Sequence, residues 1–392
     1  MSALLDVRHL GVTVGQQGKQ DKPVTIVDDV SFTVSRGEVL GLAGESGSGK
    51  TMTALALMGI LPPHTQTSGT ALFDGRDDLL ALRGNALRRI QGRRVAMVFQ
   101  DPASSLHPML TVGRQLTEHM RHHLGIGKRE ARERALDLLD QVRIPNPAAA
   151  LGSYPHQFSG GMRQRAMIAM ALSCDPGLLI ADEPTTALDV TVQAQILDLI
   201  LDLQDEFRSA VIIITHDLGV VAEVSDQILV MYAGRPVETG PAYGVFSQPG
   251  HPYTWGLLGS MPRLDVGRAE RLIPIPGTPP SLINVPSGCP FHPRCGYQAK
   301  VGEDRCTTEV PDLLGIASGY GAVDHAAACH LSADLKRSLW ANLSDPLSRT
   351  GPPPVPASAD SGTTGGEAAG GESADDDAAP LDSAGSASEG EA

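Results

Sequence analysis

Hydrophobic residues in the first 250 positions fall into short aliphatic runs separated by stretches with helical spacing. Each run is about five residues long, and the runs lie at 39–43, 95–99, 178–182, 211–215 and 227–231. None of them alternates apolar and polar positions, as a strand with one face in water would. Strands covered on both faces are typical of a mostly parallel sheet with helices on either side, so the pattern predicts an α/β fold.

The same pattern predicts how the chain divides. Residues from about 103 to 165 have helical spacing and no strand-like run, so we expect a helical insert within an α/β domain of residues 1–250. Residues 251–340 are rich in Pro and Gly without a long periodic helix, which predicts an irregular extension. Residues 341–392 form an acidic tail of low complexity. Such a tail buries too little apolar surface to fold and should be disordered.

Charge narrows the choice of partners. The 392 residues carry a net charge of −14, and nine acidic but no basic residues follow Arg349, which leaves −5 for the preceding part. An acidic surface argues against binding to nucleic acid. The N-terminal residues do not resemble a signal peptide, and no apolar run is long enough to cross a bilayer. We therefore expect a cytosolic chain, in which lasting disulfides are rare.

The stretch GESGSGKT, residues 44–51, matches the phosphate-binding pattern G-x-x-x-x-G-K-[ST] between a predicted strand and a predicted helix. Glycines allow backbone N–H groups to surround phosphate oxygens, and the helix N-terminus adds partial positive charge. Lys50 should reach the β and γ phosphates, and Thr51 should hold Mg²⁺. The residues predicted to bind ATP here are Gly44, Glu45, Ser46, Gly47, Ser48, Gly49, Lys50 and Thr51.

The run at 178–182 ends in Asp182, and Glu183 follows it, at the carboxyl edge where an α/β sheet binds ligands. Asp182 is suited to the Mg²⁺ shell. Glu183 is placed to polarise a water for in-line attack on the γ phosphate.

A second anion-binding end is predicted at Ser159, Gly160 and Gly161, just before an apolar helical stretch. One nucleotide does not need two such ends from one subunit. The second would be useful if it closes over a nucleotide held by another subunit.

Together these motifs resemble the ATP-binding subunits of ABC transporters, and the resemblance implies their P-loop NTPase fold and ATPase activity. Six motifs occur in the family's order over about 220 residues. The departures are Phe158 and Met162 at the ends of the signature motif, and Val14 where an adenine-stacking aromatic is usual. The matching positions are Lys50 in the Walker A loop, Gln100 in the Q-loop, 158–162 in the signature motif, Asp182 and Glu183 in Walker B, 187–189 in the D-loop, and His216 as the switch histidine. The resemblance implies catalytic roles for Glu183, His216 and Gln100, and makes Gln100 a further Mg²⁺ ligand.

The stretches 100–113 and 251–264 look like the subfamily that energises dipeptide and oligopeptide importers, with nickel and glutathione importers as relatives. That resemblance implies a peripheral protein on the cytoplasmic face of the cell membrane. Its partners would be permease subunits, a second ATPase subunit that is usually a paralogue and, indirectly, an extracytoplasmic solute-binding protein. An ABC-type ATPase acting on DNA or ribosomes is the alternative of another class. It is disfavoured by the single ATPase half, the lack of heptads and the acidic body.

Four of the five cysteines gather in the extension with spacing C-x5-C-x10-C-x22-C, at Cys289, Cys295, Cys306 and Cys329. The paired C-x2-C knuckles of zinc ribbons are missing, and four thiolates match the ligand need of a [4Fe–4S] cluster. The resemblance also associates such a cluster with this extension. Zinc is the second choice and free thiols are the third. A cluster would serve a structural or redox-sensing role, because the segment looks short of apolar side chains. Cys174 follows an apolar helix and is interpreted as a core residue.

Overall fold

The computed structural model describes residues 3–15, 23–186, 188–261, 275–302, 304–316 and 325–344, all within one compact unit. The predicted disordered tail begins at residue 341, but residues 341–344 are helical, which corrects its start, and the rest of the tail lies outside the described residues. Ala187 of the predicted D-loop also lies outside them. None of the helices in the described ranges has both the length and the apolar character needed to cross a membrane.

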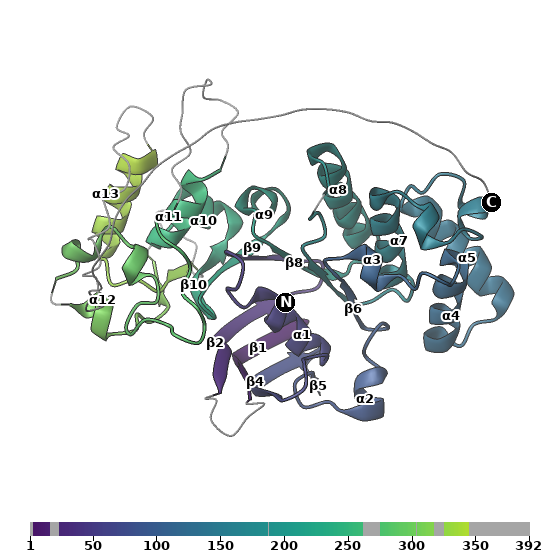
Figure 1. Ribbon diagram of the computed structural model, residues 1–392, viewed down its shortest axis with the longest axis horizontal. Coiled ribbons are helices and arrows are strands. Elements are labelled where there is room, and N and C mark those ends of the chain that lie inside the picture. The colour runs from purple at the N-terminus through teal and green to yellow at the C-terminus, as the bar shows by residue number, and fades with distance from the viewer. Residues whose placement is uncertain are drawn as a thin grey trace, which may run out of the picture. The chain divides into compact units, whose positions relative to one another are not determined.

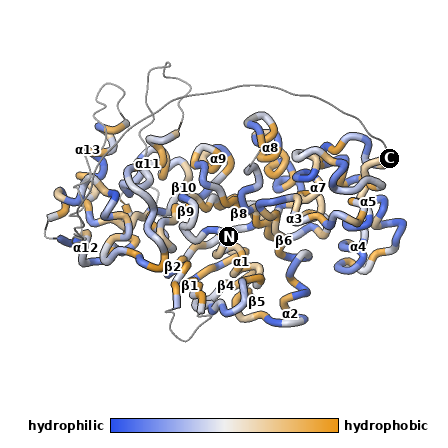
Figure 2. The backbone as a smooth tube through the Cα atoms, viewed as in Figure 1, coloured by the Kyte–Doolittle hydropathy of each residue, from blue (hydrophilic) through white to orange (hydrophobic). Residues whose placement is uncertain are grey.

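Within the described residues, the main sheet has the strand order β11-β12-β10-β9-β3-β8-β7-β6, and Figure 1 labels β10, β9, β8 and β6 of it. Its central strands pair in parallel, which confirms the predicted α/β class and all five predicted strands. These strands are β3 (Val39–Ala43), β6 (Val95–Val98), β7 (Leu178–Asp182), β8 (Ala210–Thr215) and β9 (Gln227–Tyr232). Hydrophobic residues gather along β6 and β8 in Figure 2.

Both faces of this sheet are covered, because successive residues of each strand enter different cores. In β7, Leu178 and Ile180 pack with helix α1 (Lys50–Met58), whereas Leu179 and Ala181 pack with the helices on the other side. This arrangement explains why the strands read as continuous aliphatic runs.

A second, antiparallel sheet in the order β2-β1-β4-β5 covers α1 from outside, and sequence reasoning missed it. Its long strands alternate buried and exposed positions only in part, and bulges interrupt the register of β1 with both neighbours. The strands are β1 (Leu5–Val14), β2 (Val24–Val34), β4 (Thr65–Phe73) and β5 (Asp77–Asp78), and the short helix α2 (Gly84–Arg88) follows.

Between β6 and β7 the chain is helical, as expected. The elements there are α3 (Pro102–Ser105), α4 (Val112–Leu124), α5 (Lys128–Gln141), α6 (Pro147–Ala150), the 3-10 turn η1 (Pro155–Gln157) and α7 (Gly160–Leu172). Two further helices, α8 (Val190–Phe207) and α9 (Leu218–Val224), follow β7 and β8 respectively.

The extension consists mostly of short elements, in agreement with the predicted irregular extension. The expectation of no long helix there is wrong, because α13 (Ala333–Ser344) has twelve residues. Its strands β11 and β12 extend the main sheet beyond β10. Its remaining elements, with those leading into it, are β10 (Arg235–Pro241), α10 (Ala242–Ser247), α11 (Pro252–Gly259), η2 (His292–Arg294), η3 (Gln298–Lys300), α12 (Arg305–Thr308), β11 (Leu314–Gly315) and β12 (Ala326–Ala327).

Aromatic packing holds the extension to the sheet. Phe291 meets Tyr232 of β9 edge to face at 5.3 Å between ring centroids, and Trp255 meets Tyr297 at 5.3 Å. The side chains of Tyr232 and Tyr253 are almost fully buried. The extension thus contributes to a hydrophobic core that includes residues of β9. Its low apolar content had not led us to expect such a core.

Candidate active site

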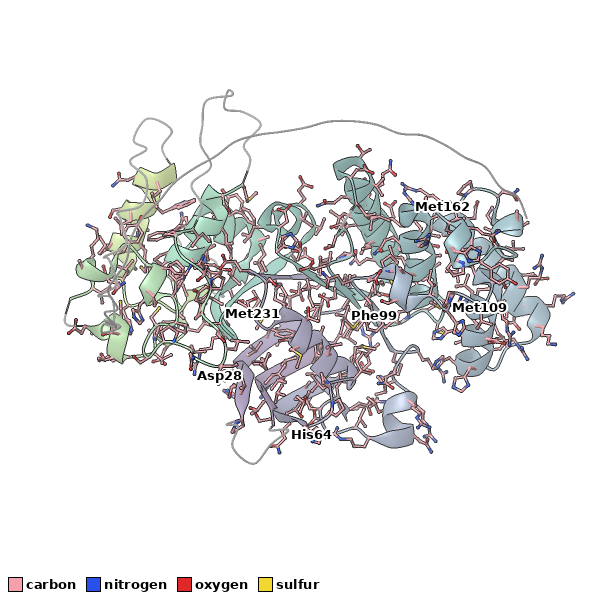
Figure 3. All side chains as sticks on the ribbon, viewed as in Figure 1. Asp28, His64, Phe99, Met109, Met162 and Met231 are labelled. Carbon is pink, nitrogen blue, oxygen red and sulfur yellow. The ribbon has the colours of Figure 1, made fainter. Side chains whose placement is uncertain are left out.

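The phosphate loop joins β3 to α1, and its glycines adopt conformations that other residues avoid. Gly44 has φ 148° and Gly49 has φ 103°. A Cβ on Gly44 would lie 2.2 Å from the carbonyl oxygen of Met231, which Figure 3 labels. Gly49 caps α1 without a side chain, and the first turn contains no acid. The N–H groups at the start of α1 therefore face no competing side-chain acceptor from the cap, which favours an anion there.

Lys50 is 5% exposed, and its Nζ donates to the loop itself. The acceptors are the carbonyl oxygens of Gly44 at 2.6 Å and Glu45 at 3.0 Å. Burial lowers the pKa of Lys50, with nearby carboxylates acting in the opposite direction. The loop therefore holds a desolvated ammonium group at its centre, ready to exchange carbonyl oxygens for phosphate oxygens.

Thr51 and Asp182 come together from α1 and β7. The Thr51 Oγ1 donates to Asp182 Oδ1 at 3.2 Å. Asp182 is 3% exposed, and burial raises its pKa, although the hydrogen bond from Thr51 acts against this. A hydroxyl and a carboxylate oxygen at the edge of a phosphate site are the kind of ligands that Mg²⁺ accepts alongside phosphates and water.

Glu183 has a left-handed backbone, with φ 47°. Its N–H donates to the carbonyl oxygen of Ile214 at 2.8 Å, so the neighbouring strand fixes this uncommon conformation.

Three donors surround the Glu183 carboxylate. Gln100 Nε2 donates to Oε2 at 2.9 Å and Thr186 Oγ1 at 2.8 Å, while His216 Nδ1 lies 3.4 Å from Oε1. Burial alone would raise the pKa of Glu183, but the hydrogen bonds from Thr186 and His216 outweigh it and lower the pKa. The carboxylate is therefore ionised at neutral pH. Gln100 binds Glu183 here rather than Thr51 or Asp182, and sequence reasoning missed Thr186 because a lone threonine after a strand carries no signal.

A chain with this geometry can bind a nucleotide and place a general base, Glu183, beside its terminal phosphate. Known proteins of similar sequence are named as ATP-binding proteins. The family described as "ABC transporter" matches residues 27–186. The protein called oligopeptide transport ATP-binding protein OppD in Haemophilus influenzae is 51% identical over 297 residues, which cover 76% of this chain and 90% of that protein. The chain belongs to the ABC transporter family. It is an ABC-type ATPase, as its motifs predicted.

Further comparisons place this ABC ATPase more closely. Residues 237–301 match the family described as "Oligopeptide/dipeptide transporter, C-terminal region". OppD of Salmonella typhimurium is 52% identical over 300 residues, covering 76% of this chain and 88% of that protein. Among solved structures, cbiO1 from Clostridium perfringens, part of the ABC transporter complex cbiONQ, is 27% identical with a TM-score of 0.53, covering 63% and 92% of the two chains. The dimeric ATP-binding cassette MJ0796, at 24% identity and TM-score 0.54 over 61% and 98% of the chains, shares the fold.

The signature loop of this ABC ATPase stands apart from the other motifs. The Ser159 Oγ caps α7 by accepting from the Met162 N–H at 3.3 Å, and a Cβ on Gly160 would meet no atom within 4 Å. In the described residues, no hydrogen bond or ion pair links Ser159, Gly160 or Gly161 to the phosphate loop. Figure 3 shows Met162, beside the signature loop, well away from Met231, beside the phosphate loop.

The four cysteines of the extension line one cavity of about 20 Å³. Burial raises the pKa of Cys289 and of Cys295 to about 12, although backbone N–H groups donate to both sulfurs and act in the opposite direction. Burial also raises the pKa of Cys306 and Cys329. Within the described ranges, no group of three or more His, Cys, Asp or Glu side chains is arranged to hold a metal ion. Cys174 packs in the core between the sheet and the helical insert.

Proposed function

We propose that this ABC ATPase powers the import of dipeptides or oligopeptides through a membrane permease. The observation that carries the proposal is the joining of two parts in one chain. One is the cluster of Lys50, Asp182 and Glu183, and the other is an extension that matches the C-terminal region of oligopeptide and dipeptide transporters. Relatives of half-identical sequence, named for oligopeptide transport, support the choice of peptides over nickel or glutathione.

Each side chain of the cluster has a role in this proposal. The backbone of residues 44–49 and the Lys50 ammonium hold the phosphates of ATP. Thr51, Asp182 and, after it turns from Glu183, Gln100 hold Mg²⁺. Glu183 accepts the proton of the attacking water, and His216, beside its other oxygen, orients that carboxylate.

The signature loop acts on the nucleotide of a second ATPase subunit. The open N-terminus of α7, exposed at Ser159 and Gly160, supports this role because it has free space for an incoming phosphate. Two subunits would then enclose two ATP molecules, and ATP would favour the closed pair because it contacts both halves only there. We infer a paralogue as the second subunit.

The remaining partners follow from the same function. The protein sits peripherally on the cytoplasmic face of the cell membrane, where permease subunits contact its Q-loop region and helical insert. A solute-binding protein delivers the peptide from outside. Exposed apolar side chains on this part, with Phe99 38% and Met109 76% exposed, support such a contact (Figure 3). We assign residues 1–250 to the ATPase domain, with the insert at about 103–165, and residues 251–340 to the extension.

Reconstitution tests this function. The chain is purified with its permease and partner ATPase, placed in liposomes with the solute-binding protein, and supplied with ATP. Labelled tripeptides should accumulate, and Lys50→Ala should abolish both uptake and ATP hydrolysis. Uptake of nickel or glutathione without peptides would select the alternative cargo. Stimulation of the ATPase by DNA or ribosomes, with no permease co-purifying, would refute the import function.

We also propose that Cys289, Cys295, Cys306 and Cys329 hold a [4Fe–4S] cluster. Their gathering around one cavity supports this, as do the N–H groups aimed at the Cys289 and Cys295 sulfurs, because thiolates in metal sites are commonly stabilised in this way. A single zinc ion needs ligands that converge on one point, whereas a cubane spreads them over four corners. The cavity must widen to admit the cluster.

Anaerobic purification tests the cluster. The protein should be brown, with broad absorption near roughly 400 nm and about four iron and four sulfide per chain. Cys295→Ser should lose the colour, while Cys174→Ser should keep it. One zinc per chain, or colourless protein without metal, would overturn the assignment.

A further inference from the structure

An arginine of the extension holds the acidic residue of the phosphate loop. Arg294 Nη1 donates to Glu45 Oε2 at 2.5 Å and Nη2 donates to Oε1 at 3.0 Å, so both carboxylate oxygens are engaged by one guanidinium. The Arg294 side chain is 4% exposed and that of Glu45 is 27% exposed. The two residues are 249 positions apart. Bidentate, largely buried pairs of this kind combine strength with fixed geometry.

The surroundings leave the guanidinium little freedom. Arg294 Nε donates to the carbonyl oxygen of Pro276 at 2.8 Å, and Nη1 lies 3.3 Å from Tyr232 Oη. Arg294 also belongs to the short turn η2, directly before Cys295. The position of the charge is therefore set by the extension together with Tyr232 of β9, in addition to the loop residue that it contacts.

A tyrosine of the extension contacts the backbone of the same loop residue, Glu45. The Glu45 backbone N–H donates to Tyr253 Oη at 2.7 Å, and Tyr253 packs against Tyr232 with 4.7 Å between ring centroids. The loop itself is rich in glycine, which allows it many conformations in isolation. Contacts from outside the loop must select one of them, and residue 45 is fixed at both its backbone and its carboxylate.

The charge of Glu45 makes this contact important for nucleotide binding. Glu45 is the one acid of the phosphate loop, and its carboxylate is close enough to Lys50 to influence the pKa of that ammonium group. An unpaired carboxylate here would repel the phosphates that the loop binds, more strongly as the number of phosphate charges grows.

We propose that Arg294, with Tyr253, is a positioning residue for ATP: it neutralises Glu45 and fixes the phosphate loop, so the C-terminal extension completes the nucleotide site. This inference rests on the proposed binding of ATP at residues 44–51. A consequence is that ATP affinity depends on the folded state of residues 289–295.

The test is isothermal titration calorimetry of the full-length protein with MgATP and, separately, with MgADP. Arg294→Gln should raise the Kd for ATP about tenfold, equivalent to about 1.4 kcal/mol, and the Kd for ADP by less. Adding Glu45→Gln to that variant should restore the affinity to within about threefold of wild type, because the repelling charge is then gone. Arg134→Gln, which breaks the ion pair between Arg134 of the helical insert and Asp175, is the matched control and should bind as wild type does.

Two outcomes would overturn the proposal while wild-type binding stays intact. One is an unchanged Kd in Arg294→Gln. The other is equal weakening for ATP and ADP without rescue by Glu45→Gln, because that pattern marks a general packing defect. If Arg294→Gln does not fold, Tyr253→Phe decides instead, because it removes the acceptor of the Glu45 N–H: the Kd for ATP should rise about fivefold, equivalent to about 1 kcal/mol, and an unchanged Kd contradicts the proposal. Failure of wild type itself to bind ATP would instead refute the proposed function.

Discussion

Replacement of Glu183 by Gln should lower the rate of ATP hydrolysis while it leaves the affinity for ATP almost unchanged, and the hydrogen bonds of the carboxylate explain why. The carboxylate has donors on both sides, Gln100 and Thr186 at Oε2 and His216 at Oε1. A glutamine amide placed with its oxygen at the Oε2 position keeps the first two hydrogen bonds. Its NH₂ group then faces His216, whose ring nitrogen can accept as well as donate.

Because all three contacts can persist, stability and ATP affinity should change by less than about 1 kcal/mol, the typical net value of one hydrogen bond. The hydrolysis rate should behave differently, since an amide cannot take the proton of the attacking water. Removing a general base typically costs on the order of 10²–10⁴ in rate. That loss corresponds to about 3–5 kcal/mol in activation free energy.

The assay measures phosphate release by the purified transporter complex and, in parallel, the Kd for MgATP. Glu206→Gln is the matched control, since the Glu206 carboxylate at the end of α8 also accepts from an amide, Gln141 Nε2, at 2.8 Å, but at an exposed position. It should leave both values unchanged. Hydrolysis by Glu183→Gln within threefold of wild type would remove Glu183 from the role of base. Loss of ATP binding would show that the hydrogen bonds do not survive the substitution.

Three further expectations concern other parts of the molecule. Gly160→Asp should leave nucleotide binding at Lys50 intact and stop hydrolysis by adding a carboxylate where a phosphate must approach, and normal turnover in the complex would contradict the composite site. Thr51→Val should reduce the ratio of ATP affinity with Mg²⁺ to that without Mg²⁺ at least tenfold, because the hydroxyl beside Asp182 is lost as a Mg²⁺ ligand. Calorimetry with and without Mg²⁺ measures this ratio, and an unchanged ratio counts against the ligand role of Thr51. Burial, together with two neighbouring imidazoles and a guanidinium, lowers the pKa of His123 to about 4. In the unfolded state its pKa is the ordinary value of about 6.5, so the unfolded chain binds more protons than the folded one between these two pH values. The free energy of unfolding therefore decreases as the pH falls through that window. The side chain is partly exposed, so the loss at pH 5.5 should be only about 0.5 kcal/mol, or about 1–2 °C in Tm; His123→Gln should reduce the pH dependence seen by calorimetry, and an equal slope in both proteins would be the contrary result.

The sequence by itself determined the parallel strands and the chemistry at their ends. The runs at β3, β7 and β8 carry no polar side chain before Asp182 and Thr215 at their carboxyl ends, because both faces are buried, and that requirement is visible in the residues. Lys50, Thr51 and Asp182 were predictable as a group since parallel strands bring their carboxyl ends to one edge. These signals are local or follow from a simple rule of topology.

Only the tertiary structure decided which distant residues meet. The antiparallel sheet was missed because bulges in β1 break the alternation by which a half-buried strand is recognised. The hydrogen bond from Thr186 to Glu183 and the ion pair of Arg294 with Glu45 were also invisible in the sequence. A pair 249 residues apart has no periodicity or spacing to mark it. It exists because aromatic packing against β9 brings the extension beside the phosphate loop, and packing of that kind depends on three-dimensional shape and not on residue order.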